Sequence, residues 1–234
     1  FEFKPPFITR DNPVGSYVRK FNIPEGWKKG RIILHFGGVY SGYTVWVNGR
    51  EAGYAEDSCL PGEFDITDCI GDGENTLAVR VFKWTDGSYL EDADHWRMSG
   101  IYRDVFLIWR PDIAIDDFGV RTIFDAKLEN ARLQIRPAIV QTPGASAEGY
   151  TVTSRLYAPD GNAAGRLLTL SVNDILSEAY PQRDNVYFAL MEDLIENPLK
   201  WNAEDPNLYT LVLTLQDGNG NCCLLYTSPS PRDS

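Results

Sequence analysis

Histidine is nearly absent from this chain, because only His35 and His95 among 234 residues carry an imidazole. A serine triad or a histidine-containing zinc site would depend on one of these two residues. Neither has suitable neighbours in the sequence, which argues against both kinds of chemistry. His35 lies in an apolar run, and we expect it to be a core or interface residue with a satisfied hydrogen bond.

Cysteine is also rare, with four residues in the chain. Cys222 and Cys223 are adjacent, and Cys59 and Cys69 fall in a loop-rich stretch without the spacing of a metal site. A domain with a large core does not need a disulfide. We therefore expect reduced structural thiols.

Long apolar segments and excess positive charge are missing as well. The longest apolar runs, such as residues 105–109, are far too short to span a bilayer, and no charged-then-apolar signal peptide opens the chain. The first residue is Phe1 rather than Met, which suggests a start inside a longer protein, so a missing signal says little about the compartment. The net charge of −11 disfavours nucleic acid and anionic membranes as partners.

No long amphipathic helix is visible, and the pattern is instead one of short period-two runs bounded by Gly, Asn, Asp and Pro. This pattern predicts an all-β protein. In the first half the expected strands are residues 17–23, 31–39, 43–47, 51–55, 76–84 and 104–109. Asn48 and Gly49 both tolerate positive φ, so we expect a type I′ hairpin there.

The strand that ends at Trp109 runs into Arg110, Pro111 and Asp112, and the proline is a natural place to stop pairing and change domain. We therefore place a boundary after residue 111. The expected strands beyond it are residues 115–123, 132–141, 150–157, 166–172, 185–191 and 209–216. This spacing is typical of an immunoglobulin-like β-sandwich over residues 112–221.

Residues 222–234 change composition abruptly and end in a Pro/Ser run. They lack strand alternation, so we expect disorder there. Our hypothesis is that this tail is non-native sequence fused to the chain, in place of a continuation that would resume a strand.

The stretch GSYLEDADHWRMSGIYRDV at residues 87–105 resembles the sugar-binding domain of bacterial β-galactosidases in glycoside hydrolase family 2. NPVGSY at 12–17, VNGR at 47–50, GYAEDSCLPGEFDI at 53–66, NPLKW at 197–201 and PNLY at 206–209 also fit the family, in family order. The resemblance covers residue 1 to about residue 221. It implies a jelly-roll (galactose-binding-like) β-sandwich over residues 1–111, lacking its N-terminal part, followed by the immunoglobulin-like domain.

The resemblance also implies a third domain, a (β/α)₈ barrel with an acid/base and a nucleophilic glutamate, which this chain lacks. The length and sequence pattern of this chain agree with that absence, because such a barrel needs about 250 residues of alternating strands and helices. Glu91, Asp92 and Asp94 could be taken for a catalytic pair, but retaining hydrolysis needs two carboxyls fixed about 5–5.5 Å apart. A flexible loop cannot fix that distance, so we expect no catalytic residue in this fragment and no activity from it alone.

Asp94 is the residue to which the resemblance gives a role. The aligned aspartate reaches from the jelly roll into the barrel's active site, where it contacts the galactosyl unit and helps hold a sodium ion. Magnesium, also expected in the complete enzyme, has its ligands in the barrel, and the fragment alone is expected to bind no cofactor. From the residues alone, Asp94 could equally be a solvated loop acid.

Three other features of this region carry expectations. His95 departs from the family pattern and could tune the rim of the sugar pocket, or be an exposed loop histidine. Trp96 and Arg97 are expected to anchor the loop, and Arg103 to pair with Asp104. The side chains of Asp57 and Ser58 are expected to cap and pin their own loop rather than touch substrate.

The first functional hypothesis is therefore the non-catalytic front of a retaining β-galactosidase that hydrolyses terminal non-reducing β-D-galactose residues in β-D-galactosides. The parent would be cytoplasmic and a homo-oligomer. The family places a substrate-contacting asparagine upstream of Phe1, so we expect weak galactose binding by the fragment. Two alternatives stay open: a free-standing lectin-like module, and the front of a related family 2 β-glucuronidase or β-mannosidase.

Overall fold

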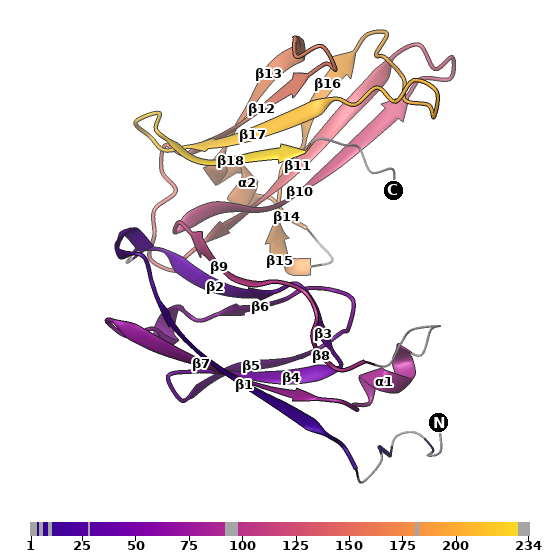
Figure 1. Ribbon diagram of the computed structural model, residues 1–234. Coiled ribbons are helices and arrows are strands. Elements are labelled where there is room, and N and C mark those ends of the chain that lie inside the picture. Colours follow the sequence, from indigo (N-terminus) through magenta and orange to yellow (C-terminus); the bar gives the residue numbers. More distant parts are fainter. Residues whose placement is uncertain are drawn as a thin grey trace. The chain divides into compact units, whose positions relative to one another are not determined.

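The computed structural model describes residues 4, 7, 8, 11–27, 29–91, 98–180 and 183–228. The chain divides into two compact units, Phe1–Arg110 and Pro111–Ser234 (Figure 1). Pro111, where the sequence predicted a change of domain, opens the second unit. Nearly all regular structure in both units is β-strand, which confirms the all-β prediction.

The first unit is built from two main antiparallel sheets and a short ribbon. One sheet has the order β1-β7-β4-β5, the other β6-β2-β9, and β3 pairs with β8. The strands are β1 (Val14–Asn22), β2 (Arg31–Phe36), β3 (Val39–Tyr40), β4 (Gly42–Val47), β5 (Arg50–Glu56), β6 (Gly62–Asp65), β7 (Glu74–Phe82), β8 (Gly100–Ile101) and β9 (Val105–Arg110). Two 3₁₀ turns, η1 (Glu25–Trp27) and η2 (Thr67–Cys69), and helix α1 (Gly87–Leu90) connect them.

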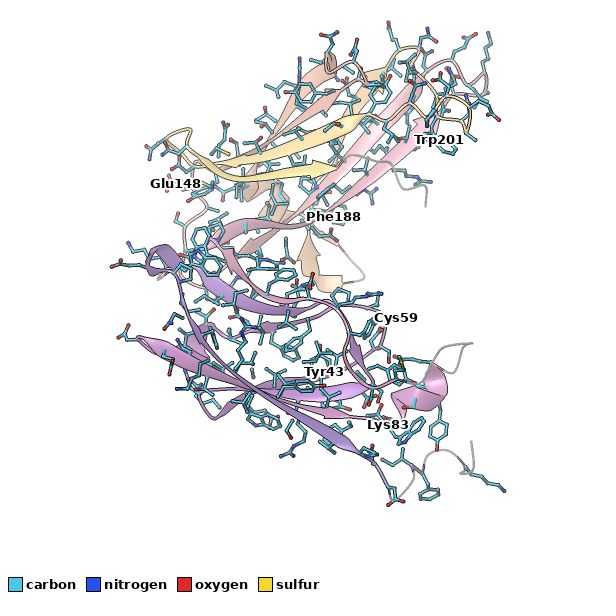
Figure 2. All side chains as sticks on the ribbon, in the orientation of Figure 1. Tyr43, Cys59, Lys83, Glu148, Phe188 and Trp201 are labelled. Atoms are coloured by element: carbon cyan, nitrogen blue, oxygen red, sulfur yellow. The ribbon has the colours of Figure 1, made fainter. Side chains whose placement is uncertain are left out.

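The core of the first unit lies between these sheets. Every second residue of β4 points inward, so Tyr43, Val45 and Val47 are buried against Leu34 and Phe36 of β2. Tyr43 lies deep in this core (Figure 2), with its ring tilted against Phe36 at a centroid distance of 5.0 Å. The period-two pattern of the sequence thus becomes the inner face of a sandwich.

The β4–β5 hairpin turns at Asn48 and Gly49. Their φ angles are 52° and 79°, the positive values that a type I′ turn needs, which confirms the predicted turn residues. Asn48 has a second function, because its Nδ2 donates to the Cys69 carbonyl at 2.9 Å and to Asn75 Oδ1 at 2.7 Å. The turn is therefore tied to the neighbouring loop.

The second unit is also a pair of antiparallel sheets. One has the order β10-β11-β16, the other β13-β12-β17-β18, and β14 pairs with β15. The strands are β10 (Ile113–Phe124), β11 (Ala131–Gln141), β12 (Thr151–Tyr157), β13 (Ala163–Ser171), β14 (Ala179–Tyr180), β15 (Arg183–Tyr187), β16 (Met191–Ile195), β17 (Thr210–Gln216) and β18 (Cys222–Ser228). Helix α2 (Val172–Ser177) follows β13.

The core of this unit is again formed by alternate residues. In β11, Leu133, Ile135 and Ile139 are buried, whereas Arg132 and Arg136 are exposed. The inner residues of β17, among them Leu213, pack against them from the other sheet. Neither helix among the described residues has the length and apolar composition needed to cross a membrane.

The strand expected at residues 185–191 is wrong in its limits, because β15 ends at Tyr187 and a separate strand, β16, begins at Met191. The inward residues of β16 are Met191, Asp193 and Ile195. Asp193 broke the apolar alternation, so the sequence did not predict this strand. Its carboxylate is satisfied by the main-chain amide of Arg166 at 2.6 Å and the guanidinium Nε at 2.8 Å.

The expectation that residues 222–234 hold no strand is also wrong for Cys222–Ser228. These residues form β18, which pairs antiparallel with β17 from Gln216↔Cys222 to Leu211↔Ser228. Backbone groups along an unpaired strand edge accept any extended segment that can reach them. Pairing of this kind does not require apolar alternation, which explains why the sequence pattern failed here.

Leu213→Ala tests the core of the second unit. Leu213 is fully buried, so we expect a loss of about 2–5 kcal/mol in the free energy of unfolding of that unit. Urea denaturation followed by circular dichroism measures it. The matched control is Leu167→Ala, at a residue 58% exposed on β13, where the change should stay within about 0.5 kcal/mol. Equal effects would contradict the described core.

Asp193 gives a pH-dependent prediction. Burial by itself raises the pKa of Asp193, but the amide and guanidinium of Arg166 outweigh it and hold that pKa below its usual range. A carboxylate with a lowered folded pKa stabilises the fold above its unfolded pKa of about 3.9, and this contribution is lost as the pH falls through the folded pKa. We expect Asp193→Asn to destabilise the chain at neutral pH, with a difference that shrinks below about pH 4.

Urea titrations across that pH range measure this difference. The control is Glu192→Gln, at an exposed carboxylate on the same strand. A deficit of Asp193→Asn that stayed constant with pH would show that Asp193 is not the titrating group.

Candidate functional site

The two residues with predicted site roles, Asp94 and His95, lie outside the described residues, as do Trp96 and Arg97. Their predicted roles therefore stay predictions. The structure describes the chain on both sides of residues 92–97, and these two flanks show how the segment is attached to the first unit.

The flank before the segment is fixed by buried hydroxyl groups. Thr85 Oγ1 donates to Ser41 Oγ at 3.1 Å, and the Thr85 amide donates to Ser88 Oγ at 3.1 Å. All three residues are buried. Helix α1 therefore starts from a position tied to the end of β3, and residues 87–90 lead from there to Glu91.

Glu91 joins this flank to the turn after β5. Its Oε1 accepts the Ser58 amide at 3.0 Å, and its Oε2 accepts the Ser58 hydroxyl. Asp57 Oδ1 accepts the amides of Cys59 and Leu60, both at 3.0 Å. This confirms that the side chain of Asp57 caps its own loop, whereas the hydroxyl of Ser58, which is only 2% exposed, binds Glu91 instead.

The chain that follows residues 92–97 contacts the same turn after β5. β8 pairs with β3, and the following Tyr102 hydroxyl donates to the Ser58 carbonyl. Arg103 Nη1 donates to the Cys59 carbonyl at 2.9 Å and to the Gly37 carbonyl at 3.1 Å. The predicted pairing of Arg103 with Asp104 is therefore wrong, because the guanidinium holds backbone carbonyls instead.

Gly38 makes the approach of this flank possible. A Cβ at Gly38 would lie 2.8 Å from Cζ of Tyr102 and 3.0 Å from Cδ of Arg103. A side chain at position 38 would therefore force the side chains of Tyr102 and Arg103 to shift.

Ser58 is thus the junction of the region, since its amide, hydroxyl and carbonyl bind the two flanks of residues 92–97. Glu91 and Tyr102, which lie before and after residues 92–97 in the sequence, therefore both bind this one turn. We call Ser58, Glu91 and Tyr102 the Ser58 junction. The sequence drew attention to Ser58 and Glu91, but as a loop residue and a doubtful catalytic acid, and it did not reveal that they bind each other.

Two tyrosines near this region are suited to donate hydrogen bonds rather than to act as bases. Burial raises the pKa of Tyr43 to about 12. Burial, together with the hydrogen bond to Glu56, also raises the pKa of Tyr54 well above its ordinary value. Both hydroxyls therefore keep their protons at neutral pH.

His35 has the satisfied hydrogen bond that its sequence context predicted. Its Nδ1 lies 2.9 Å from Glu63 Oε1, and its ring stacks on Phe106 with centroids 4.4 Å apart. The cysteines in the described ranges form no disulfide, and Cys59 and Cys222 are exposed.

The described residues do not by themselves fit a metal site. In the ranges given above, no three histidine, cysteine, aspartate or glutamate side chains form a group that could hold an ion. Glu91, the described carboxylate next to the segment, is already bound to Ser58.

Comparison with known families assigns both units. Residues 1–111 match the sugar binding domain of glycosyl hydrolases family 2, and residues 113–224 match a second domain described as glycosyl hydrolases family 2. This chain belongs to glycoside hydrolase family 2. The family resemblance of its sequence is confirmed over almost its whole length.

Relatives support this assignment. The family 2 chain is 43% identical to a β-galactosidase of Priestia megaterium and 40% identical to one of Leuconostoc mesenteroides, each over 94% of its length. It spans about a fifth of those relatives, 21% of each. A solved structure of Bacteroides uniformis β-glucuronidase matches with a TM-score of 0.74 at 24% identity, covering 92% of this chain and 26% of that one, which shows the fold alone.

Glu91→Ala tests the Ser58 junction. Removing the carboxylate leaves the buried Ser58 amide without its acceptor, at a cost of about 1–3 kcal/mol, so this amide should exchange its hydrogen about tenfold to a hundredfold faster. Hydrogen exchange read by NMR measures it. The control Glu74→Ala removes an exposed ion pair with Lys20 and should leave Ser58 unchanged. Undiminished protection in Glu91→Ala would contradict the junction.

Proposed function

We propose that this chain forms the front, non-catalytic domains of a β-galactosidase that hydrolyses terminal non-reducing β-D-galactose residues in β-D-galactosides. The observation that carries the proposal is the identity of 43% and 40% to two β-galactosidases over 94% of the chain. The stretch at residues 87–105, which resembles the sugar-binding domain of these enzymes, agrees with it.

In this proposal Asp94 is the residue that the chain contributes to the sugar site. A carboxylate accepts hydrogen bonds from sugar hydroxyls and is a hard oxygen ligand for a cation such as sodium. The Ser58 junction would give Asp94 a fixed point of attachment, because both flanks of its segment bind one buried residue. His95 would lie at the rim of the same site.

The reacting carboxyls belong, in the proposal, to other parts of the parent protein. Retaining hydrolysis needs two carboxyls held about 5–5.5 Å apart. Asp57 and Glu91, the described acids beside the segment, are both engaged with the amides of the turn, which removes them as candidates. We expect the chain by itself to be inactive, and the sodium and magnesium of the complete enzyme remain predictions.

A β-glucuronidase parent is the second candidate. The fold of the Bacteroides uniformis β-glucuronidase is compatible with this candidate, and an identity of 24% shows the fold alone. A cytoplasmic location and a homo-oligomeric parent are parts of the proposal that rest on family resemblance.

A pair of chimeras distinguishes the two candidates. In each, residues 1–221 of this chain replace the matching front segment of a relative, either the Priestia megaterium β-galactosidase or the Bacteroides uniformis β-glucuronidase. We expect the first chimera to hydrolyse a nitrophenyl β-galactoside and the second to have little activity on the corresponding glucuronide. The 234-residue chain alone should give no turnover.

Asp94→Asn in the galactosidase chimera tests the residue. Loss of a charged hydrogen-bonding group costs about 1.5–3 kcal/mol, which corresponds to a fall in kcat/KM of about 10- to 150-fold. Asp72→Asn, in the exposed turn before β7, should leave kcat/KM unchanged. An unchanged kcat/KM of Asp94→Asn would contradict the proposed role of Asp94 in the sugar site. Micromolar galactose affinity of the isolated chain, measured by calorimetry, would instead favour a lectin-like module.

A further inference from the structure

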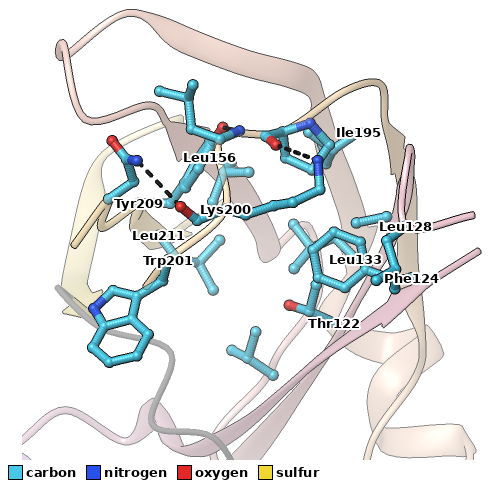
Figure 3. A pocket seen from close by; sticks show the side chains of 15 residues that line it. Thr122, Phe124, Leu128, Leu133, Leu156, Ile195, Lys200, Trp201, Tyr209 and Leu211 are labelled. Atoms are coloured by element: carbon cyan, nitrogen blue, oxygen red, sulfur yellow. Dashed lines mark hydrogen bonds between the residues drawn. The ribbon is translucent and has the colours of Figure 1, made fainter. Parts of the chain in front are cut away.

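The second unit contains a cavity of about 410 Å³ that is open to solvent (Figure 3). Its floor comes from both sheets, with Leu133 of β11, Ile195 of β16 and Leu211 of β17, and all three are buried. The cavity is therefore continuous with the core of this unit.

The rim of the cavity is apolar and exposed. Phe124 and Leu128 lie on one side and Trp201 on the other (Figure 3), and Leu199 also lines the cavity. Leu128 is 59%, Leu199 55% and Trp201 57% exposed. Apolar residues gathered around a cavity in this way mark a surface that binds a partner, because each would otherwise remain in contact with water.

The polar groups at the rim are used to hold the rim itself. Tyr209 Oη accepts the Leu199 amide at 2.9 Å, and Asn207 Nδ2 donates to the Lys200 carbonyl at 3.2 Å. Lys200 Nζ lies 3.5 Å from the Pro198 carbonyl. A sugar needs several hydrogen-bonding partners to replace water, but most residues that line this cavity are apolar and some of its few polar groups already bind the rim. The cavity therefore fits apolar side chains better than a carbohydrate.

The position of β18 indicates which part of the protein supplies the apolar side chains that would fill the cavity. β18 runs antiparallel to β17 and reaches Leu211, on the cavity floor, with its last residue, Ser228. The pairing therefore brings the end of β18 next to the floor of the cavity. The chain spans about a fifth of its family 2 relatives, so most of each of those proteins lies outside the matched segment.

We propose that this cavity is the seat for apolar side chains of the polypeptide that follows the second domain in the complete protein. This inference rests on the proposed function, in which the chain is the front part of a larger enzyme. A second copy of the chain is the other candidate occupant, and the labelling experiment distinguishes the two.

Cysteine labelling tests the occupant. Leu199→Cys is compared in two proteins, the 234-residue chain alone and the galactosidase chimera joined after Asn221. We expect the thiol to react with a maleimide at least about tenfold more slowly in the chimera, because burial limits access to it. Peptide mass spectrometry separates this site from the native cysteines. Leu128→Cys, from the opposite side of the cavity, should give the same result.

The matched control is Leu167→Cys, at a residue that is 58% exposed on β13 and outside the cavity, which should react equally fast in both proteins. Equal reactivity of Leu199→Cys in both proteins would overturn the proposal. So would protection in the chain alone that rises with its concentration, since that indicates a second copy. A chimera with the Leuconostoc mesenteroides relative repeats the comparison. If the thiol of Leu199→Cys is protected but the chimera is inactive, the proposed function is contradicted and the proposed occupant of the cavity is not. If the chimera is active but this thiol reacts freely, the proposed occupant is contradicted and the proposed function is not.

Discussion

Both units depend on one constraint, which is that a strand in a sandwich turns every second side chain toward the facing sheet. In the first unit this places Tyr43, Val45 and Val47 inside, and in the second Leu133, Ile135 and Leu213. Each fully buried side chain of this size contributes about 1.5–3 kcal/mol. The apolar alternation thus fixes which face of each strand is buried, and the strand ends then determine where the loops emerge.

Loops held on such a framework carry the chemistry of the proposed site. The turn at residues 57–60 follows β5, and residues 92–97 lie between α1 and β8, far apart in the sequence. The Ser58 junction brings their described parts together through three groups of one buried residue. Serine suits this position, because its small side chain donates a hydrogen bond to Glu91 while its main-chain carbonyl accepts one from Tyr102.

Polar residues inside a sandwich are tolerated only where each finds a partner. Asp193 faces inward on β16 and is satisfied by Arg166, whose neighbour Gly165 has a φ of +71° and no side chain to block the carboxylate. In contrast, the cavity rim keeps its polar groups for its own loop and presents apolar side chains outward. The satisfied Asp193 belongs to a closed core. The apolar rim belongs to a surface that, in our proposal, a further part of the protein covers.

The sequence by itself determined the class of fold, the type I′ turn at Asn48 and the family, because alternation, turn residues and motifs are local patterns. It also identified Asp57 as a residue that caps its own loop. It could not reveal β16, since Asp193 is compatible with an inward position only when Arg166 lies opposite it. Nor could it reveal β18, whose pairing depends on the free edge of β17. Only the tertiary structure decided that Glu91 and Tyr102 meet at Ser58, and that Trp201 and Phe124 border one cavity, because these contacts join residues that no local pattern connects.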